Sequence, residues 1–469
     1  AKLPFEFDLI KKIYSQQRET DGGIITDYYP NEKPVEYADA NTETTSIVII
    51  AILTPPKTII VPDDYPAIQQ AINAASPRDT VFVRSGTYYE NVVANKTISL
   101  IGENRSTTII DGMGTLFVLE VSADDTTIKD FTIQNGCYVV GLCNVSNARI
   151  ENNYVSNYDY PYRDHQGVNI LIVLSENITL RGNLIEDGYI GVGLAASTNC
   201  TLRNNNMSRN LMNFGIEIAG LNITYTDLKY YLHDIDESNL VDGRPIYYWI
   251  NQSDRQVPSD AGYVAAIKCL NITLRGITLT NNVQNVLFFQ TDSSTIKNLK
   301  MKNSGYGMNL IQSNHNKISN VTMEEEDVLQ YTSLLLLDSN HNKVSDCNAS
   351  NCWYDGITLA NSSFNVLLRN NLEGNGNGLH LELSHSNLIL ENNVINNEWR
   401  GIELFDTKDN VFYHNNFVNN KKQIVVTGSS NDTWDNGYPC GGNYWSDYDG
   451  LDLFSGLYQN ETGSDGIGD

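Results

Sequence analysis

The clearest pattern in this chain is a repeat of apolar and polar positions in its C-terminal half. Four lines begin at Asn342, Asn365, Asn387 and Asn410, so the period is 22 or 23 residues. Each line holds short runs of alternating apolar and polar residues, separated by corners rich in Asn and Gly. Alternation with period two predicts strands, and a fixed period of this length predicts a solenoid.

We therefore predict an all-β fold, a single-stranded right-handed parallel β-helix with one coil per repeat. One coil cannot bury its inward side chains alone, whereas stacked coils pair every strand and share a core. Asn suits the corners because it tolerates left-handed backbone and can form ladders between coils, so we interpret these residues as part of the fold. Upstream residues at the line-start position predict roughly a dozen coils; they are Asp125, Asn147, Asn177, Asn199, Asn222, Asn271, Ser293 and Asn316.

The pattern divides the chain into three parts: an arm at 1–56, the β-helix at 57–430 and a C-terminal cap at 431–469. Irregular spacing predicts a bulging loop at 157–166 and an insertion at about 230–260. Tyr65–Ala75 is expected to form a helix over the first coil, with Asp63 or Asp64 as N-cap and Pro66 in its first turn. The aromatic stretch Trp434–Tyr448 is expected to cover the last coil.

The arm contains an uninterrupted apolar run, whose assembly candidates are Ile47, Val48, Ile49, Ile50, Ile52 and Leu53. The run is too short to span a bilayer and must be buried in protein. One interpretation is a strand on the chain's own sheet. The other is a strand donated to a neighbouring copy, which would join copies into a homopolymer.

The net charge of −25 and pI of about 4.6 argue against nucleic acid as a partner, because that attraction needs clustered Lys and Arg. No stretch has the length of a transmembrane segment. A start at Ala1 is consistent with signal cleavage, which favours an extracellular or cell-surface location. Candidate glycosylation sequons fit such a location; they are Asn95, Asn104, Asn144, Asn177, Asn199, Asn206, Asn222, Asn251, Asn271, Asn320, Asn348, Asn361, Asn431 and Asn460.

The seven cysteines form no CxxC pair, which argues against a zinc site. Cys137 with Cys143, or Cys347 with Cys352, are the pairs close enough in sequence to bridge a coil corner. Spacing alone leaves both pairings open.

Three segments resemble a known family: VPDDYPAIQQAINAASPRDTVFVRSGTYYENV from Val61, NLVDGRPIYYWINQ from Asn239, and GGNYWSDYDG from Gly441 with the final GSDGIGD. They are similar to NosD-like proteins with carbohydrate-binding/sugar-hydrolase (CASH) domains, especially archaeal surface proteins with parallel β-helix repeats. The resemblance covers about 57–469 and implies a pectin-lyase-like β-helix. The family includes a copper-site accessory factor, sugar-active enzymes and surface proteins, so the resemblance does not select one function.

Coil equivalence stacks Thr358, His380, Glu403 and Val425, and it stacks Asp355, Asn377, Arg400 and Lys422 beside them. His380 and Glu403, with Glu382 nearby, form the best acid/base cluster that the repeat predicts. Trp353, Trp399 and Arg400 would form a sugar-stacking wall, and Trp353 is expected to stack on Asn375, Glu398 and Asn420. The alternative is an exposed ladder of mixed polar residues.

A second cluster combines Asp159, Asp164 and His165 on the bulging loop with Glu186 and Asp187. In the tail, Asp465 and Asp469 flank glycines in a pattern that suits Ca²⁺, the one cofactor that the sequence suggests. The seven His residues are too scattered in sequence to predict a copper site.

These observations give three hypotheses. The first is a secreted structural protein whose β-helix assembles with copies of itself into a filament, sheath or surface layer. The second is a carbohydrate-active enzyme or a glycan-binding module for acidic polysaccharide; no carboxylate pair recurs in a way that demands catalysis, so binding is favoured over enzymatic activity. The third is a metal-site accessory protein.

Overall fold

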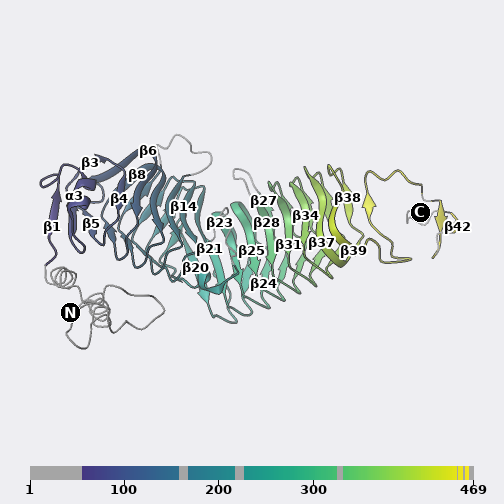
Figure 1. Cartoon of the computed structure of the whole chain (residues 1–469). Helices are drawn as coiled ribbons and strands as arrows, with labels where there is room; N and C mark the ends of the chain where they lie inside the picture. The colour runs from purple at the N-terminus through teal and green to yellow at the C-terminus, as the bar shows by residue number, and fades with distance from the viewer. Residues whose placement is uncertain are drawn as a thin grey trace, which may run out of the picture. The chain divides into compact units, whose positions relative to one another are not determined.

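A computed structural model describes residues 55–157, 167–216, 226–324, 331–451, 453–457 and 460–463. The chain divides into two units, Ala1–Thr58 and Ile59–Asp469, and nearly all described residues belong to the second. That unit is a right-handed parallel β-solenoid of about 16 turns, which confirms the predicted fold class (Figure 1). The predicted dozen coils is too low, because several coils precede Asp125, the first line start that the repeat reveals.

Each regular turn contributes strands to three stacks of parallel strands. The first stack holds β1 (Thr58–Val61), β2 (Thr80–Val83), β5 (Ser99–Gly102), β7 (Thr127–Lys129), β9 (Arg149–Glu151), β12 (Thr179–Arg181), β15 (Thr201–Arg203), β18 (Asp234–Ile235), β22 (Thr273–Arg275), β24 (Thr295–Lys297), β26 (Lys317–Ser319), β29 (Lys343–Ser345), β32 (Val366–Leu368) and β35 (Leu388–Leu390). The second holds β3 (Gly86–Tyr89), β10 (Tyr154–Ser156), β13 (Leu184–Glu186), β16 (Asn206–Ser208), β19 (Leu240–Val241), β27 (Thr322–Glu324), β30 (Asn348–Ser350), β33 (Asn371–Glu373), β36 (Asn393–Ile395), β38 (Asn416–Val418) and β40 (Tyr444–Trp445).

The third stack, which carries the candidate site, holds β4 (Val92–Ala94), β11 (Val168–Val173), β14 (Ile190–Ala195), β17 (Met212–Ile216), β20 (Arg244–Ile250), β21 (Tyr263–Ile267), β28 (Thr332–Leu337), β31 (Asp355–Ala360), β34 (Asn377–Glu382) and β39 (Ile424–Thr433). Five long strands run through a corner and join two stacks: β6 (Thr108–Val121), β8 (Thr132–Cys143), β23 (Thr278–Phe289), β25 (Lys300–Ile311) and β37 (Arg400–Tyr413).

Alternation along each strand sends every second side chain into the solenoid. In the third stack Ile357, Leu379 and Ile402 lie at equivalent positions of successive coils and are almost fully buried. Burying a side chain of this size stabilises the fold by roughly 1.5–3 kcal/mol. The outward positions between them are therefore free to carry polar residues.

Asparagine serves the corners in two ways. Many corner residues have positive φ, and most of these are Asn or Asp. A second set, which sequence reasoning did not separate from the first, points inward: Asn365 Oδ1 accepts the backbone N–H of Asn342 (2.8 Å), and Asn387 Oδ1 accepts that of Asn365 (2.8 Å). These buried ladders satisfy backbone donors that the corner would otherwise leave unpaired.

The N-terminal helix is shorter than predicted and is capped differently. Helix α3 spans Ile68–Ala74, its N-cap residue makes no side-chain hydrogen bond, and the carboxylate of Glu90 accepts the N–H groups of Ile68 (2.9 Å) and Gln69 (3.0 Å) instead. The predicted caps, Asp63 and Asp64, are used elsewhere, by Arg84 and by the N–H of Ile60. The prediction failed because a carboxylate from the next coil can reach the helix start.

The regular winding is interrupted once by an antiparallel pair, β19 with β20, joined through Asp242 and Gly243, which both have positive φ. A 3-10 helix, η1 (Leu228–Tyr231), precedes it. The tail also forms a small antiparallel pair, β41 (Phe454–Ser455) with β42 (Glu461–Thr462).

Aromatic rings stack at the C-terminal end of the core. Trp434 stacks on Phe412, and Trp445 stacks on Phe417, each with ring centroids 4.3 Å apart. These contacts cover the apolar side chains that the last regular coil would otherwise expose.

None of the seven cysteines, all of which lie in the described residues, forms a disulfide, so the two candidate disulfides are wrong. Cys137 and Cys143 lie along the same strand, β8, and six residues of strand span about 20 Å. Cys347 and Cys352 are likewise separated by β30. In the described part of the chain no helix is long and apolar enough to cross a membrane.

Candidate functional site

The strongest cluster of chemistry lies at the start of β31, β34 and β37, on the outward side of the third stack. The structure pairs Thr358 with His380 and His380 with Glu403, as the repeat predicts. It also pairs Asp355 with Asn377 and Asn377 with Arg400. The coil spacing therefore placed both columns correctly.

Asp355 is the centre of this cluster, although the repeat alone does not distinguish it from its column neighbours. Its carboxylate accepts from Thr358 Oγ1 (2.7 Å) and from Asn377 Nδ2 (2.9 Å), and its Oδ2 lies 3.4 Å from His380 Nδ1. Asn377 Nδ2 also donates to Glu403 Oε2 (3.2 Å) and so bridges the two carboxylates.

Arg400 serves this carboxylate network and does not form a stacking wall on its own. Its guanidinium donates to Glu403 Oε2 at 2.5 Å, and both side chains are partly exposed. Glu382, the third predicted member, is exposed and pairs by register with Ala360 and Phe405. It adds negative charge near the cluster and acts at longer range than Asp355.

Asn377 carries an unused acceptor. The residue is only 4 % exposed, and its Oδ1 is buried with no hydrogen-bond partner among the described residues. An unpaired buried carbonyl costs about 1–3 kcal/mol, so such atoms normally receive a donor from water or a ligand. Asn377 Oδ1 is one of eleven such side-chain atoms among the described residues, and its burial keeps it from the surface.

The pKa of His380 is raised above its ordinary value of 6.5. Partial burial alone would lower this pKa, but the hydrogen bond that His380 donates to Asp355 and the negative charges of Asp355, Glu403 and Glu382 outweigh burial. The imidazole therefore holds its proton to a higher pH than a free histidine does, and it can donate a proton or a hydrogen bond near neutrality.

An aromatic wall stands beside the cluster. Trp353 is 52 % exposed and meets Trp399 edge to face (6.2 Å, 83°), and Tyr354 does the same (5.5 Å, 80°). Tyr354 stacks on Tyr331 with ring centroids 5.8 Å apart, and Tyr331 stacks in turn on Tyr306 at 5.7 Å. The two tyrosines before β28 and β31 were missed because the repeat was anchored on Gly and Asn.

The expected stacking of Trp353 on Asn375 is wrong by one residue. Cys352, not Trp353, lies in register with Asn375, whose Oδ1 accepts the Cys352 N–H (3.0 Å). Asn397, not Glu398, is the next ladder residue. The turn before β34 is one residue shorter than the turns before β31 and β37, which a single fixed period does not reveal.

The remaining predicted sites lie partly or wholly outside the described residues or are used in ion pairs. Asp159, Asp164 and His165 lie outside the described residues, and Glu186 and Asp187 form an ion pair with Arg209 (2.6 and 3.0 Å). The calcium candidates Asp465 and Asp469 and the apolar run Ile47–Leu53 also lie outside them. Of the sequon asparagines, Asn222 lies outside the described residues, Asn177, Asn206 and Asn348 are half-buried, and the others are exposed.

Copper ligation does not fit the donors that the structure describes. No three His, Cys, Asp or Glu side chains of the described residues converge on one point. The closest His pair, His315 and His341, stacks face to face (4.9 Å, 4°), and stacked imidazoles do not aim nitrogen lone pairs at a shared metal.

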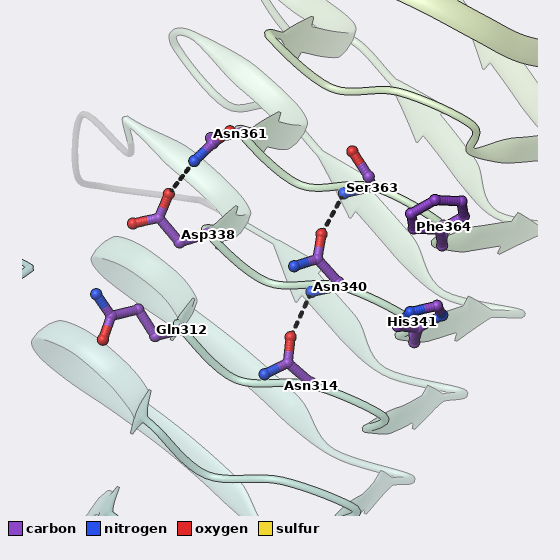
Figure 2. A pocket seen from close by; sticks show the side chains of 8 residues that line it. All are labelled: Gln312, Asn314, Asp338, Asn340, His341, Asn361, Ser363 and Phe364. Atoms are coloured by element: carbon purple, nitrogen blue, oxygen red, sulfur yellow. Dashed lines mark hydrogen bonds between the residues drawn. The ribbon is translucent and has the colours of Figure 1, made fainter.

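A polar groove of about 620 Å³ lies at the other end of the same strands (Figure 2). Its lining residues are Gln312, Asn314, Asp338, Asn340, His341, Asn361, Ser363 and Phe364. No prediction from the sequence included this groove.

Comparison with known proteins supports the fold. Residues 249–450 match the family described as periplasmic copper-binding protein (NosD), and residues 106–232 match the right handed beta helix region. No curated protein matches the chain.

Several solved structures are similar to this chain at low identity and low TM-score. They include the periplasmic alginate epimerase AlgG (11 % identity, TM-score 0.31, covering 80 % of this chain and 83 % of that one). A PL6 alginate lyase in complex with a trisaccharide (11 %, 0.30, 88 % and 92 %) and the Dettilon tailspike protein (13 %, 0.30, 79 % and 68 %) are similar too. At this identity the likeness concerns the fold and assigns no residue.

Proposed function

We propose that this right-handed parallel β-helix protein, whose residues 249–450 match the NosD family, is an extracytoplasmic glycan-binding protein whose site is the cluster around Asp355. The observation that carries the proposal is the exposed aromatic wall of Trp353 and Tyr354 beside the partly exposed, hydrogen-bonded side chains of Glu403 and Arg400. The periplasmic description of the matched family and the exposed sequons support a location outside the cytoplasm.

A sugar ring complements this surface. Its hydroxyl groups donate and accept hydrogen bonds, and its apolar face stacks on an indole ring. Trp and Tyr supply a flat apolar body with a polar tip. Asp355, Asn377, Glu403 and Arg400 supply acceptors and donors already held in place by their own hydrogen bonds. Such preorganised polar groups discriminate strongly for ligands with matching hydroxyl groups.

Local charge favours an uncharged glycan over the acidic polysaccharide suggested by the sequence. Asp355, Glu382 and Glu403 carry three negative charges, against the cations Arg400 and His380, on a chain of net charge −25. A uronate would be repelled by the whole surface and would compete with Glu403 for Arg400.

The test is retention of the full chain by immobilised neutral and uronate polysaccharides, followed by titration with the one retained. Trp353→Ala and Glu403→Gln should each weaken binding by at least about tenfold, because contacts of this kind contribute roughly 1.5 kcal/mol or more. Tyr89→Ala removes an exposed aromatic residue at the N-terminal coils and should leave binding unchanged. Equal binding by all four proteins would refute the site.

The same experiment separates binding from cleavage. Release of reducing ends or unsaturated products that is lost in His380→Ala and Glu403→Gln would make the protein an enzyme acting on the glycan. Binding without product release leaves it a binding module.

A second function, assembly with copies of itself into a filament, sheath or layer, is favoured by one observation. Large apolar side chains are exposed close together in sequence near the C-terminus: Tyr438, Tyr444, Tyr448, Leu451, Leu453, Phe454 and Leu457. Such surfaces usually mark contacts with another protein. Electron microscopy of the full chain should show ordered polymers that disappear on deletion of 1–56 or in a Leu451→Ser, Leu453→Ser, Leu457→Ser variant; unchanged assembly in both would refute a role for either end.

A further inference from the structure

The groove in Figure 2 has two different walls. Gln312, Asp338 and Asn361 follow directly after β25, β28 and β31 and form the polar wall. His341 and Phe364 form the aromatic wall. The groove therefore runs across successive coils, with one kind of chemistry on each side.

The aromatic wall stands on left-handed backbone. His315, His341 and Phe364 have φ of 58, 58 and 59°, a left-handed conformation that costs a bulky residue roughly 1–2 kcal/mol. The same column holds Ser293 one coil before and Ser386 one coil after, also with positive φ. Because the coil accepts serine there, the fold alone does not require the rings.

The rings form a short, open-ended stack. His315 lies on His341 (4.9 Å, 4°), and His341 lies on Phe364 (5.1 Å, 9°). Beyond Phe364 the column continues with a serine, so one face of the phenyl ring has no aromatic neighbour in the column, and the residue is 55 % exposed. Strained residues that the fold does not need are typical of ligand sites.

The floor of the groove presents donors. The Oδ1 atoms of Asn314 and Asn340 accept backbone N–H groups of the following coil (2.8 and 2.7 Å), so their orientation is fixed. Their amide nitrogens point toward the polar wall (Figure 2), and that of Asn314 also makes a long contact with Asp292 Oδ1 (3.4 Å). There Asp338 Oδ1 accepts from Asn361 (2.6 Å), while its Oδ2 has no partner among the described residues. The groove thus offers fixed donors and an acceptor beside an apolar ring face.

This groove and the Asp355 cluster sit at the two ends of the same strands. Tyr331 and Tyr354 directly precede β28 and β31, whereas Asp338 and Asn361 directly follow them. A strand of six residues spans about 20 Å. The outward face between the two ends carries Thr358, His380 and Glu403.

We propose that the groove is a second sugar subsite of the same glycan-binding surface. A long oligosaccharide would then run along the strands of the third stack, from one end to the other, and be held at both ends. This inference rests on the proposed function. A ligand that reaches only one end gains one set of contacts. A ligand that spans both gains the second set without a second association cost.

The test is titration of the full chain with neutral gluco- and manno-oligosaccharides, from disaccharide to octasaccharide. Affinity should be flat for short ligands and rise by about tenfold or more once the ligand spans the strand face. Phe364→Ser and His341→Asn should abolish that rise and leave the affinity for short ligands unchanged. Trp353→Ala should weaken ligands of every length.

Met113→Ser is the matched control. Met113 is also exposed (59 %), apolar and left-handed (φ 54°), but it lies in an N-terminal coil. Its replacement should leave the affinity at every length unchanged. Phe364→Ser should unfold at the same temperature as the parent or higher, because serine occupies this column in the neighbouring coils.

Three outcomes would overturn the inference. If affinity does not rise with ligand length, or if the rise persists in Phe364→Ser, the groove takes no part in binding. A Phe364→Ser protein that loses stability and keeps the rise shows that the rings serve the fold. Failure of every oligosaccharide to bind refutes the proposed function too, whereas binding that depends on Trp353 but shows no rise in affinity with ligand length refutes the second subsite alone.

Discussion

Protonation of His233 should weaken the fold in mild acid. The imidazole is 2 % exposed and lies at a corner in the first stack, just before β18. Its Nδ1 accepts the backbone N–H of Cys200 (3.2 Å), and its Nε2 lies 2.9 Å from the carbonyl oxygen of Tyr230. Since Nδ1 accepts, Nε2 carries the single proton and donates it to Tyr230. A second proton on Nδ1 would break the Cys200 contact and bury a charge.

Burial lowers the pKa of His233 from 6.5 to about 4, although the hydrogen bond to Tyr230 opposes this shift. In the unfolded chain the group titrates near 6.5. Between these values the unfolded chain binds a proton that the folded chain lacks, so stability falls as the pH decreases. The difference corresponds to about 3 kcal/mol, and the loss is complete below about pH 4.

His380 contributes with the opposite sign and must be separated from this effect. Its pKa is raised, so its stabilising contribution is full below pH 6.5 and is lost as the pH rises through the raised value. The two histidines therefore act in different pH windows, and only His233 weakens the fold below 6.5.

The assay compares urea unfolding of the parent with that of His233→Asn at pH values from 7 to 4. Asn316 holds the equivalent corner position, where its Oδ1 accepts the N–H of Ser294 (2.9 Å), so asparagine can replace the Nδ1 contact without titrating. The parent should lose about 3 kcal/mol relative to the variant over this range. Parallel pH curves for the two proteins would refute the reasoning.

Three further predictions concern the coil itself, each measured by the free energy of unfolding in urea. Asn387→Ala leaves the buried N–H of Asn365 without its acceptor and should cost about 2 kcal/mol or more, whereas Asn393→Ala, in an outer ladder, should stay within about 0.5 kcal/mol. Gly376→Ala places a Cβ 2.4 Å from a backbone oxygen and should cost about 1–3 kcal/mol, while Gly86→Ala, with ordinary contacts only, should cost less. Glu90→Ala removes the acceptor at the start of α3 and should cost about 1 kcal/mol.

The sequence predicted the fold because the coil imposes one constraint many times. Every turn needs inward apolar residues and corners that tolerate positive φ, so the period is visible without any relative for comparison. The register between neighbouring coils follows from the same repeat. The predicted columns through His380 and Asn377 are correct because the strands that carry them begin at equivalent positions.

The details that the repeat does not predict depend on features that occur in one coil only. Trp353 was placed one residue out of register because turn lengths differ between neighbouring coils, and the period averages over that difference. Asp355 was not recognised as central, since its role depends on side-chain directions that a column does not contain. Glu90 caps α3 from another coil, a contact that no local pattern could indicate.

Two departures from the repeat lie on the surface for which we propose glycan binding, and the coil requires neither of them. Before β34 the turn is short and holds Gly376, whereas before β31 one extra residue makes room for Trp353 and Tyr354. At the other end of β31, Phe364 stands where neighbouring coils use serine. The extra residue before β31 costs conformational entropy, and Phe364 costs backbone strain. Neither residue improves packing in the core. Because a cheaper alternative is present one coil away in each case, the two departures are best explained by one ligand that touches both ends of the same strands.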